Sequence, residues 1–148
     1  MYKHLLIATD GSELAGKGVE HGLYLAKQLG AEVTLLSVTE PLSSEVVRAA
    51  RSGGVSDPVT LYEQNMDEQV NKFTDSAKAR AGELGVTIDV ARETDSSPAE
   101  AIVRTAKLRN CDLIVMASHG RRGIQKMLLG SQTSEVLVRT TIPVLVIR

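Results

Sequence analysis

The alternation of short apolar runs with segments of helical spacing is the feature of this sequence that most limits its fold. Apolar runs of strand type occupy residues 5–8, 33–38, 86–90, 113–116 and 144–147. Several of them are nearly continuous hydrophobic stretches, which is typical of strands buried on both faces. Strands that alternate with helices in this way predict an α/β domain with a mainly parallel sheet and right-handed crossovers.

Helical spacing is clear in the segments that follow the first and second apolar runs. One stripe consists of Ala15, Val19, Leu23, Ala26 and Leu29, and the other of Met66, Val70, Phe73, Ala77, Ala81 and Leu84. Stripes of this kind are expected to pack against a sheet. Gly16, Gly18 and Gly22 lie in the first helical segment, and we expect them to let it approach the sheet closely, at some cost in helix propensity.

A further helix is predicted at Ser97-Pro98-Ala99-Glu100, where Ser at the N-cap, Pro at the first helical position and Glu at the third form a capping box. Residues 40–61, by contrast, have weak periodicity and many helix breakers, and they predict a long connection. Connections of this length are functional flaps or mobile insertions. Within it, residues 44–51 can form a short helix.

Composition limits the class of protein and its partners. A chain of 148 residues fits one domain, residues 1–148, with a core large enough to need no disulfides. Its 17 basic and 18 acidic side chains give a net charge of −1, so we expect neither nucleic acid nor membrane as a partner. The apolar runs are far shorter than the ~20 residues that span a bilayer. One cysteine, Cys111, and no signal-peptide architecture predict a cytoplasmic protein.

The residues that follow each predicted strand are the candidates for a binding site, because open parallel sheets bind ligands outside the carboxyl ends of their strands. They are Thr9-Asp10-Gly11-Ser12, Thr39-Glu40, Glu93-Thr94-Asp95 and Ala117-Ser118-His119-Gly120. Asp10 follows an apolar strand directly. Its carboxylate can therefore point into the crevice, cap the first helix, or do both.

The segment after the fourth strand has the composition of a phosphate-binding loop. It contains Gly120, Gly123 and Gly130, with Arg121, Arg122 and Lys126 between them. Glycines allow positive φ and close approach of backbone N–H groups to an anion. Ser131-Gln132-Thr133 would begin the last helix, where free N–H groups and the helix dipole favour phosphate. From spacing alone, an ordinary strand-to-helix loop with Ser131 as a cap is an equal alternative.

Two common nucleotide-binding patterns are missing from the sequence. A P-loop requires Lys after its second glycine, whereas Gly130 is followed by Ser131. Gly16, Gly18 and Gly22 are spaced one residue too far for the dinucleotide fingerprint, and they lie inside a helix rather than at a strand-to-helix turn. The sequence therefore favours neither a P-loop NTPase nor a dehydrogenase.

Three stretches resemble the universal stress protein family: IATDGSELAGKGVEHGLYLAKQLGAEVTLLSV, SSPAEAIVRTA and DLIVMASHGRRGIQKMLLGSQTSEVLVRTTIPVLVIR. ATP-binding members carry Gly, two residues, Gly, nine residues, and then Gly followed by Ser or Thr. Gly120, nine residues and Gly130-Ser131 match the second part, and Ala117 replaces the first glycine. The resemblance implies a Rossmann-like domain of the adenine nucleotide alpha hydrolase type, with strand order 3-2-1-4-5 and helices on both faces.

The resemblance also implies an adenine nucleotide ligand, ATP or else ADP or AMP, bound with Mg²⁺. Asp10 would bind the ribose or base region, and the backbone around Val38 would meet the adenine edge. Gly120, Gly130 and the start of the last helix would hold the phosphates. The full set of implied site residues is Ala8, Thr9, Asp10, Val38, Met116, Ala117, Ser118, His119, Gly120, Arg121, Gly130, Ser131, Gln132 and Thr133.

By the same resemblance, the chain is predicted to be a stress-response switch that acts through protein partners the sequence does not identify. One alternative is a stress protein that binds partners without nucleotide. Another is a slow ATP hydrolase or autophosphorylating protein, with hydroxyls at Ser118, Ser131, Thr133 and Ser134 near the phosphates. No residue is predicted to be catalytic, because His119 lacks a partner carboxylate in sequence, and no protein metal site is expected.

The C-terminal apolar strand predicts an interface between two copies of the chain. Residues 142–148 are apolar except for Arg148, and Pro143 removes one ladder donor, which favours an edge position in the sheet. An apolar edge invites pairing with another edge. We therefore expect a two-fold homodimer with antiparallel final strands, as the resemblance also implies. A monomer with a covered edge is the alternative.

Overall fold

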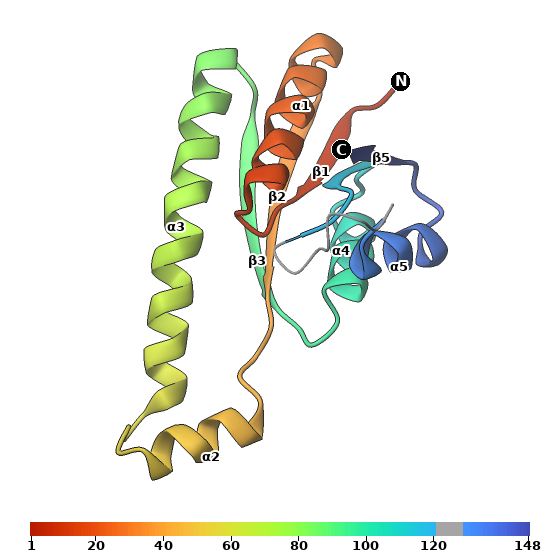
Figure 1. Ribbon diagram of the computed structural model, residues 1–148. Coiled ribbons are helices and arrows are strands. Elements are labelled where there is room, and N and C mark those ends of the chain that lie inside the picture. Colours follow the sequence, from red (N-terminus) through yellow and green to blue (C-terminus); the bar gives the residue numbers. More distant parts are fainter. Residues whose placement is uncertain (121–128) are drawn as a thin grey trace.

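Strands and helices alternate along the residues that the computed structural model describes, 1–120 and 129–148 (Figure 1). The strands are β1 (His4–Ala8), β2 (Glu32–Thr39), β3 (Ile88–Thr94), β4 (Leu113–Ala117) and β5 (Val144–Ile147). The helices are α1 (Glu13–Leu29), α2 (Ser44–Ser52), α3 (Pro58–Leu84), α4 (Pro98–Leu108) and α5 (Ser131–Arg139). Four residues of the expected phosphate-binding loop lie outside the described residues: Arg121, Arg122, Gly123 and Lys126.

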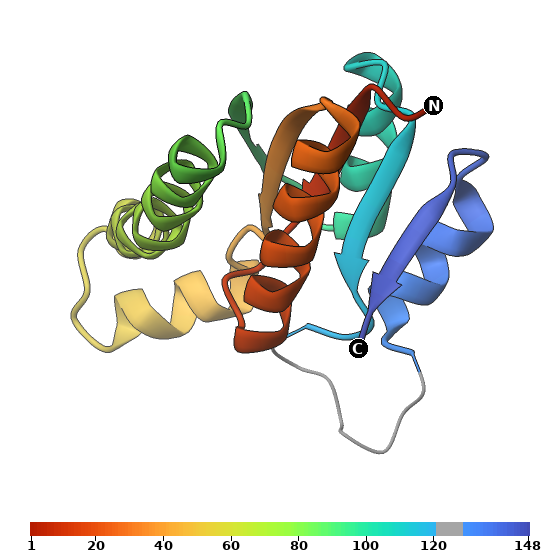
Figure 2. The same cartoon turned by 90° about the horizontal axis from the view of Figure 1, so that it is seen from above.

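The five strands form one parallel sheet in the order β3-β2-β1-β4-β5. Helices α1 and α3 cover one face of the sheet, and α4 and α5 cover the other (Figure 2). The predicted α/β fold is confirmed, with its strand order and its helices on both faces. The order reverses at β1, so the carboxyl ends of β1, β2 and β4 form the crevice in which such sheets bind ligands.

Strand β1 shows why the apolar runs must be buried on both faces. Its residues Leu5 and Ile7 pack against α1 and α3, whereas Leu6 packs against the α4 and α5 layer. All three side chains are fully buried. Because successive side chains of a strand point to opposite faces, consecutive apolar residues fit only between two helical layers.

Strand β3 differs from its predicted range. It begins at Ile88 rather than at residue 86, and it extends to Thr94. Glu93 and Thr94, which were expected to follow the strand, instead pair with Val38 and Thr39 of β2. β3 is an edge strand in which only Ala91 is buried, so its polar residues resemble a loop in the sequence.

The predicted connection 40–61 is shorter than expected, because α3 begins inside it at Pro58. Proline suits the first position of a helix, where its missing N–H costs nothing. Asp57 is the N-cap, and its carboxylate accepts a hydrogen bond from the amide of Thr60. The short helix expected at residues 44–51 is confirmed as α2.

Helix α3 is much longer than the strands beside it. Its 27 residues span about 40 Å, whereas the 8 residues of β2 span about 26 Å. The C-terminal half packs on the sheet through Ala77 and Ala81. The N-terminal half extends past the carboxyl ends of the strands, where α2 precedes it (Figure 1). Neither α3 nor any other helix in the described part of the chain is long and apolar enough to cross a membrane.

Of the three α1 glycines, only Gly22 is needed for tight contact with the sheet. A Cβ at Gly22 would lie 2.5 Å from Cδ1 and 2.9 Å from Cγ1 of the buried Ile7. At Gly18 a Cβ would make an ordinary contact, 3.7 Å from the amide nitrogen of Ala117, and at Gly16 it would meet open space. The predicted role is confirmed for Gly22 and is wrong for Gly16.

These two glycines give a matched pair of variants. We expect Gly22→Ala to lower the free energy of unfolding by about 1–3 kcal/mol, the usual cost of overpacking a core. Gly16→Ala should raise it by about 1 kcal/mol, because alanine is the better helix former and nothing obstructs its methyl group. Urea unfolding followed by circular dichroism measures both. Equal changes in the two variants would contradict the packing argument.

Candidate functional site

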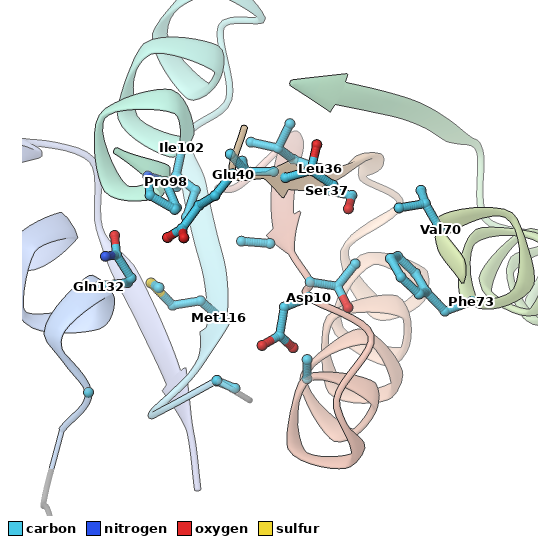
Figure 3. Close-up of a pocket in the computed structure, with 18 of the residues that line it drawn as sticks. Asp10, Leu36, Ser37, Glu40, Val70, Phe73, Pro98, Ile102, Met116 and Gln132 are labelled. Atoms are coloured by element: carbon cyan, nitrogen blue, oxygen red, sulfur yellow. The ribbon is translucent and has the colours of Figure 1, made fainter. Parts of the chain in front are cut away.

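A cavity of about 460 Å³ opens at the carboxyl ends of β1, β2 and β4, with α3, α4 and α5 around it (Figure 3). The predicted site residues in its wall are Ala8, Thr9, Asp10, Val38, Met116, Ala117, His119, Gly120, Gly130, Ser131, Gln132 and Thr133. Ser118 is only 2% exposed and is not part of the wall. Arg121 lies outside the described residues.

The segment after β1 directs Asp10 into this cavity (Figure 3). Gly11 has a φ of 75°, a left-handed conformation that glycine tolerates, and it turns the chain toward α1. Ser12 rather than Asp10 caps the helix, because the Ser12 side chain accepts a hydrogen bond from the amide of Ala15. Asp10 Oδ1 accepts from the amide of Ser12 at 2.9 Å. Oδ2 faces Gly120, where an added Cβ would come within 2.5 Å of it.

Gly120 and Gly130 allow close packing rather than a left-handed backbone. Neither has a φ in the left-handed region, and Gly130 has a φ of −72°. Of the two properties that glycine allows, these positions use close approach and not positive φ. A Cβ on Gly130 would lie 3.1 Å from Cα and 3.2 Å from Cβ of His119. The amide of Gly130 donates a hydrogen bond to the carbonyl of Ser118 at 2.7 Å. This bond joins the end of β4 to the start of α5.

Helix α5 begins at the cavity with Ser131, Gln132 and Thr133, as predicted. Gly130 is its N-cap, and no described side chain makes a capping hydrogen bond. The first N–H groups of a helix lack intrahelical partners and carry the positive end of the dipole. The Thr133 hydroxyl is buried and donates to the carbonyl of Ala117 at 2.9 Å, so it holds the helix in place. The N-terminus of α5 therefore offers donors to an anion.

Gln132 links the two helices on this side of the cavity. Its Oε1 accepts a hydrogen bond from the amide of Ala99 at 2.9 Å. Helix α4 starts as predicted, with Ser97 at the N-cap and Pro98 next, but the Ser97 side chain makes no capping bond, so the predicted capping box is wrong. The carboxylate of Asp95 accepts from the Ser97 amide instead. The first turn of α4 thus depends on a side chain from α5.

Ser118 and His119 belong to the frame of the site. The amide of Ser118 donates to the carbonyl of Ile147 at 2.7 Å, which ties the end of β4 to β5. Its hydroxyl lies 3.1 Å from Nδ1 of His119. Because Ser118 is held on both sides and buried, only His119 of this pair reaches the cavity wall.

Asp95, one of the candidates that follow the predicted strands, is engaged away from the cavity. The amide of Ser97 and the guanidinium of Arg104 hold the pKa of the Asp95 carboxyl below its usual value. Asp95 is not among the wall residues. Within residues 1–120 and 129–148 there is no group of three or more His, Cys, Asp or Glu side chains that could hold a metal ion.

Helix α3 forms a part of the wall that was not predicted from the sequence. Met66, Val70 and Phe73 were expected to pack against the sheet, but they line the cavity because this half of α3 lies beyond the strands. The Tyr62 hydroxyl donates to the carbonyl of Glu40 at 2.7 Å and ties α3 to the end of β2. Thr39 and Glu40, two of the candidates that follow the predicted strands, also lie in the wall. Further unpredicted wall residues are Ala15, Leu36, Ser37, Gln69, Pro98 and Ile102.

A signal for this wall does exist in the sequence. The helical stripe carries large side chains in its first part, Met66 and Phe73, and then two small ones, Ala77 and Ala81, before it ends at Leu84. Small residues suit the half that packs closely on the sheet. The stripe is also longer than a strand of ordinary length can cover. Both observations together predict a helix whose first half faces something other than the sheet.

A model of the universal stress protein family matches residues 1–148. The chain belongs to this family. Universal stress protein YxiE of Bacillus subtilis is 31% identical over 151 residues, covering 100% of both chains. Universal stress protein MJ0531 of Methanocaldococcus jannaschii is 31% identical over 148 residues, covering 100% of this chain and 83% of that protein.

Solved structures of universal stress proteins share the fold. The structure of MJ0577 superposes with a TM-score of 0.81 at 26% identity, covering 99% of this chain and 96% of the other. A universal stress protein in complex with cAMP gives a TM-score of 0.73 at 22% identity, with 99% and 97% covered. One from Archaeoglobus fulgidus in complex with dAMP gives 0.68 at 15% identity, with 99% and 98% covered.

Ala117 stands in place of the first glycine of the family's nucleotide pattern without backbone strain. Among the described residues other than glycine, only Asn110 has a positive φ. The position of Ala117 therefore needs no glycine conformation. The residue is 8% exposed, and it forms part of the cavity wall.

The bond between Gln132 and Ala99 can be tested by two substitutions. Gln132→Ala leaves the buried amide of Ala99 without its acceptor and should destabilise the protein by about 1–3 kcal/mol. Gln132→Glu keeps an acceptor and adds negative charge at a helix N-terminus, so it should preserve stability. Denaturant unfolding distinguishes the two. Equal destabilisation by both variants would show that the acceptor is not what matters.

Proposed function

We propose that this universal stress protein binds an adenine nucleotide, with ATP as the favoured ligand, and acts as a cytoplasmic regulatory switch in a stress response. The observation that carries the proposal is a single cavity in which the Asp10 carboxylate, the end of β2 and the N-terminus of α5 meet. The universal stress proteins that were solved with cAMP and with dAMP support adenine nucleotides as the ligand class.

Each part of the nucleotide has a matching part of the cavity in this proposal. The phosphates lie at the N-terminus of α5, where the amides of Ser131 and Gln132 offer donors. Gly120 and Gly130 keep that end open, because a Cβ at either position would crowd neighbouring atoms. Asp10 accepts hydrogen bonds from ribose hydroxyls. The base reaches the end of β2, where the backbone of Val38 meets its edge.

Magnesium would enter with the triphosphate rather than occupy a site of its own. Asp10 and Glu40 are the carboxylates of the described cavity wall. Mg²⁺ usually keeps several waters and binds through one or two carboxylates plus substrate phosphates. The two carboxylates, together with the phosphates of the ligand, fit this mode of coordination. The bound ion would neutralise part of the phosphate charge.

The switch would be read out through α5. This helix meets the phosphates at its start, holds α4 through Gln132, and leads into β5 at the edge of the sheet. Leu137 and Val138 of α5 and Leu145 of β5 are exposed there. A ligand that binds one arrangement of α5 better than another shifts the population toward it. Protein partners would then meet a different surface at this edge.

Calorimetric titration of ligand-stripped protein with ATP and Mg²⁺ tests the proposal. We expect saturable binding near 1 μM, which corresponds to about −8 kcal/mol. Gly130→Val should abolish it, since the branched side chain cannot fit beside His119, and Gly16→Ala is the control with open space around it. No heat at millimolar ATP, with an unshifted melting temperature, would favour the alternative of a stress protein that acts without nucleotide.

We also propose a homodimer through residues 142–148. Strand β5 lies at the edge of the sheet and pairs with β4 on its inner side. Val144, Leu145 and Val146 keep exposed surface at this edge. Antiparallel pairing of two such edges about a two-fold axis would satisfy the ladder groups and cover the apolar side chains.

A charge at the proposed interface should separate the copies. We expect Val146→Lys to give the monomer mass by light scattering, because two opposed lysines would stand at the paired edges. Val59→Lys on the first turn of α3, whose side chain is 38% exposed, is the control and should leave the dimer intact. An unchanged dimer mass for Val146→Lys would point to another interface.

A further inference from the structure

Helix α2 and the chain on either side of it form an arm that is attached to the rest of the protein at its two ends. We define the α2 arm as residues 41–57, between β2 and α3 (Figure 1). No residue of the arm is buried. Within the described part of the chain, the arm makes no hydrogen bond or ion pair beyond itself and the first turn of α3. The arm can therefore move as a unit and lose few contacts.

Both ends of the α2 arm are anchored at the cavity. Glu40, which precedes the arm, is a wall residue, and so is Tyr62 in the second turn of α3. The Tyr62 hydroxyl donates to the Glu40 carbonyl at 2.7 Å and joins the two anchors. The arm itself contributes no residue to the wall. It therefore stands outside the cavity, while the residues that hold it belong to the cavity wall.

Helix α2 has apolar surface that the structure leaves uncovered. Val46 is 50% exposed, and Val47 and Ala50 are only half-buried. A helix of nine residues is too short to be stable alone in water, so its stability depends on packing of its apolar side. In the cavity wall, the apolar side chain of Met66 also keeps exposed surface. The hydrophobic effect would favour an arrangement in which the arm and the wall cover each other.

Charge favours the same arrangement. Helix α2 carries two exposed basic residues, Arg48 and Arg51, and one acidic residue, Glu45. The described part of the cavity wall contains two carboxylates, Asp10 and Glu40, and neither Lys nor Arg. Opposite charges attract more strongly as the water between them is excluded. The phosphates of a nucleotide would add negative charge on the cavity side.

We propose that the α2 arm is a lid that closes over the cavity when a nucleotide fills it. The inference rests on the proposed nucleotide function and adds a moving part to it. A bound nucleotide supplies the surface and the negative charge that favour the closed arrangement, so it shifts the population toward that arrangement. Gly53 and Gly54 connect α2 to the chain before α3, and Gly54 has a φ of 92°. Glycine tolerates this left-handed conformation, and the pair suits a hinge.

Hydrogen exchange followed by mass spectrometry tests the closure. If the amides of α2 exchange through the open arm and ATP binds the closed arm, ATP with Mg²⁺ at ten times its Kd should slow their exchange about 10-fold. The last turn of α4, which carries the exposed Leu108 at the opposite end of the sheet, is the internal control and should exchange as before. Unchanged exchange in α2, with ATP binding shown by calorimetry, would overturn the lid while the nucleotide function stood.

Val46→Thr tests whether the exposed side of α2 becomes covered. Threonine keeps the β-branched shape and the helix propensity of valine, and Val46 is half exposed in the free protein, so the variant should fold as the unaltered protein does. We expect it to weaken ATP binding about 3- to 10-fold in calorimetric titration, because closure would bury the remaining surface of Val46. Leu108→Thr makes a similar exchange far from the arm and should leave the ATP affinity unchanged.

Three outcomes would contradict the lid. Equal ATP affinity for Val46→Thr and the unaltered protein would show that α2 stays uncovered in the complex. Protection of α2 that rises with protein concentration in the absence of ATP would assign its exposed side to a second copy of the chain. If the unaltered protein bound no ATP, the proposed function would fail and this inference with it.

Discussion

The backbone hydrogen bond from the amide of Gly130 to the carbonyl of Ser118 fixes where α5 begins, and the geometry of the cavity depends on it. Because the start of α5 is held against the end of β4, its first N–H groups open into the crevice. The same placement lets Gln132 reach the first turn of α4. The contact favours glycine, since a Cβ at this position would lie only 3.1 Å from Cα of His119. One main-chain bond thus organises two helices and the anion-binding end of the cavity.

The fold was predictable because the buried strands of a parallel sheet are runs of consecutive apolar residues, which are easy to recognise in the sequence. Consecutive apolar residues such as Leu5, Leu6 and Ile7 have nowhere to lie except between two helical layers. This pattern of consecutive apolar residues is weaker in the strands at the edge of the sheet. In β3 only Ala91 is buried, and the other positions are half-buried or exposed, so Glu93 and Thr94 look like the start of a loop although they pair with β2. Edge strands therefore set the limit on boundary prediction here.

The candidate site was predictable where topology alone brings residues together. Asp10 and Gly120 follow neighbouring parallel strands, so they had to meet at one edge of the sheet. The bond between Gln132 and Ala99 joins residues 33 apart and leaves no local pattern. The part of the wall that α3 forms depends on how far this helix extends past the ends of the strands, and only the packing of the helix on the sheet determines that length. Glycine spacing, finally, does not distinguish a need for positive φ from a need for space.

The half of α3 that extends past the strands also places a fluorescent side chain, Tyr62, in the cavity wall. The chain has three tyrosines and no tryptophan, so no indole absorption or emission hides the phenol signal. Tyr62 lies in the cavity wall with its hydroxyl bonded to the carbonyl of Glu40. Phenol fluorescence responds to hydrogen bonding at the hydroxyl and to quenching by stacked rings. The molecule therefore carries an unlabelled reporter at its cavity, and Tyr2 and Tyr24, which lie outside the wall, provide the background against which it is read.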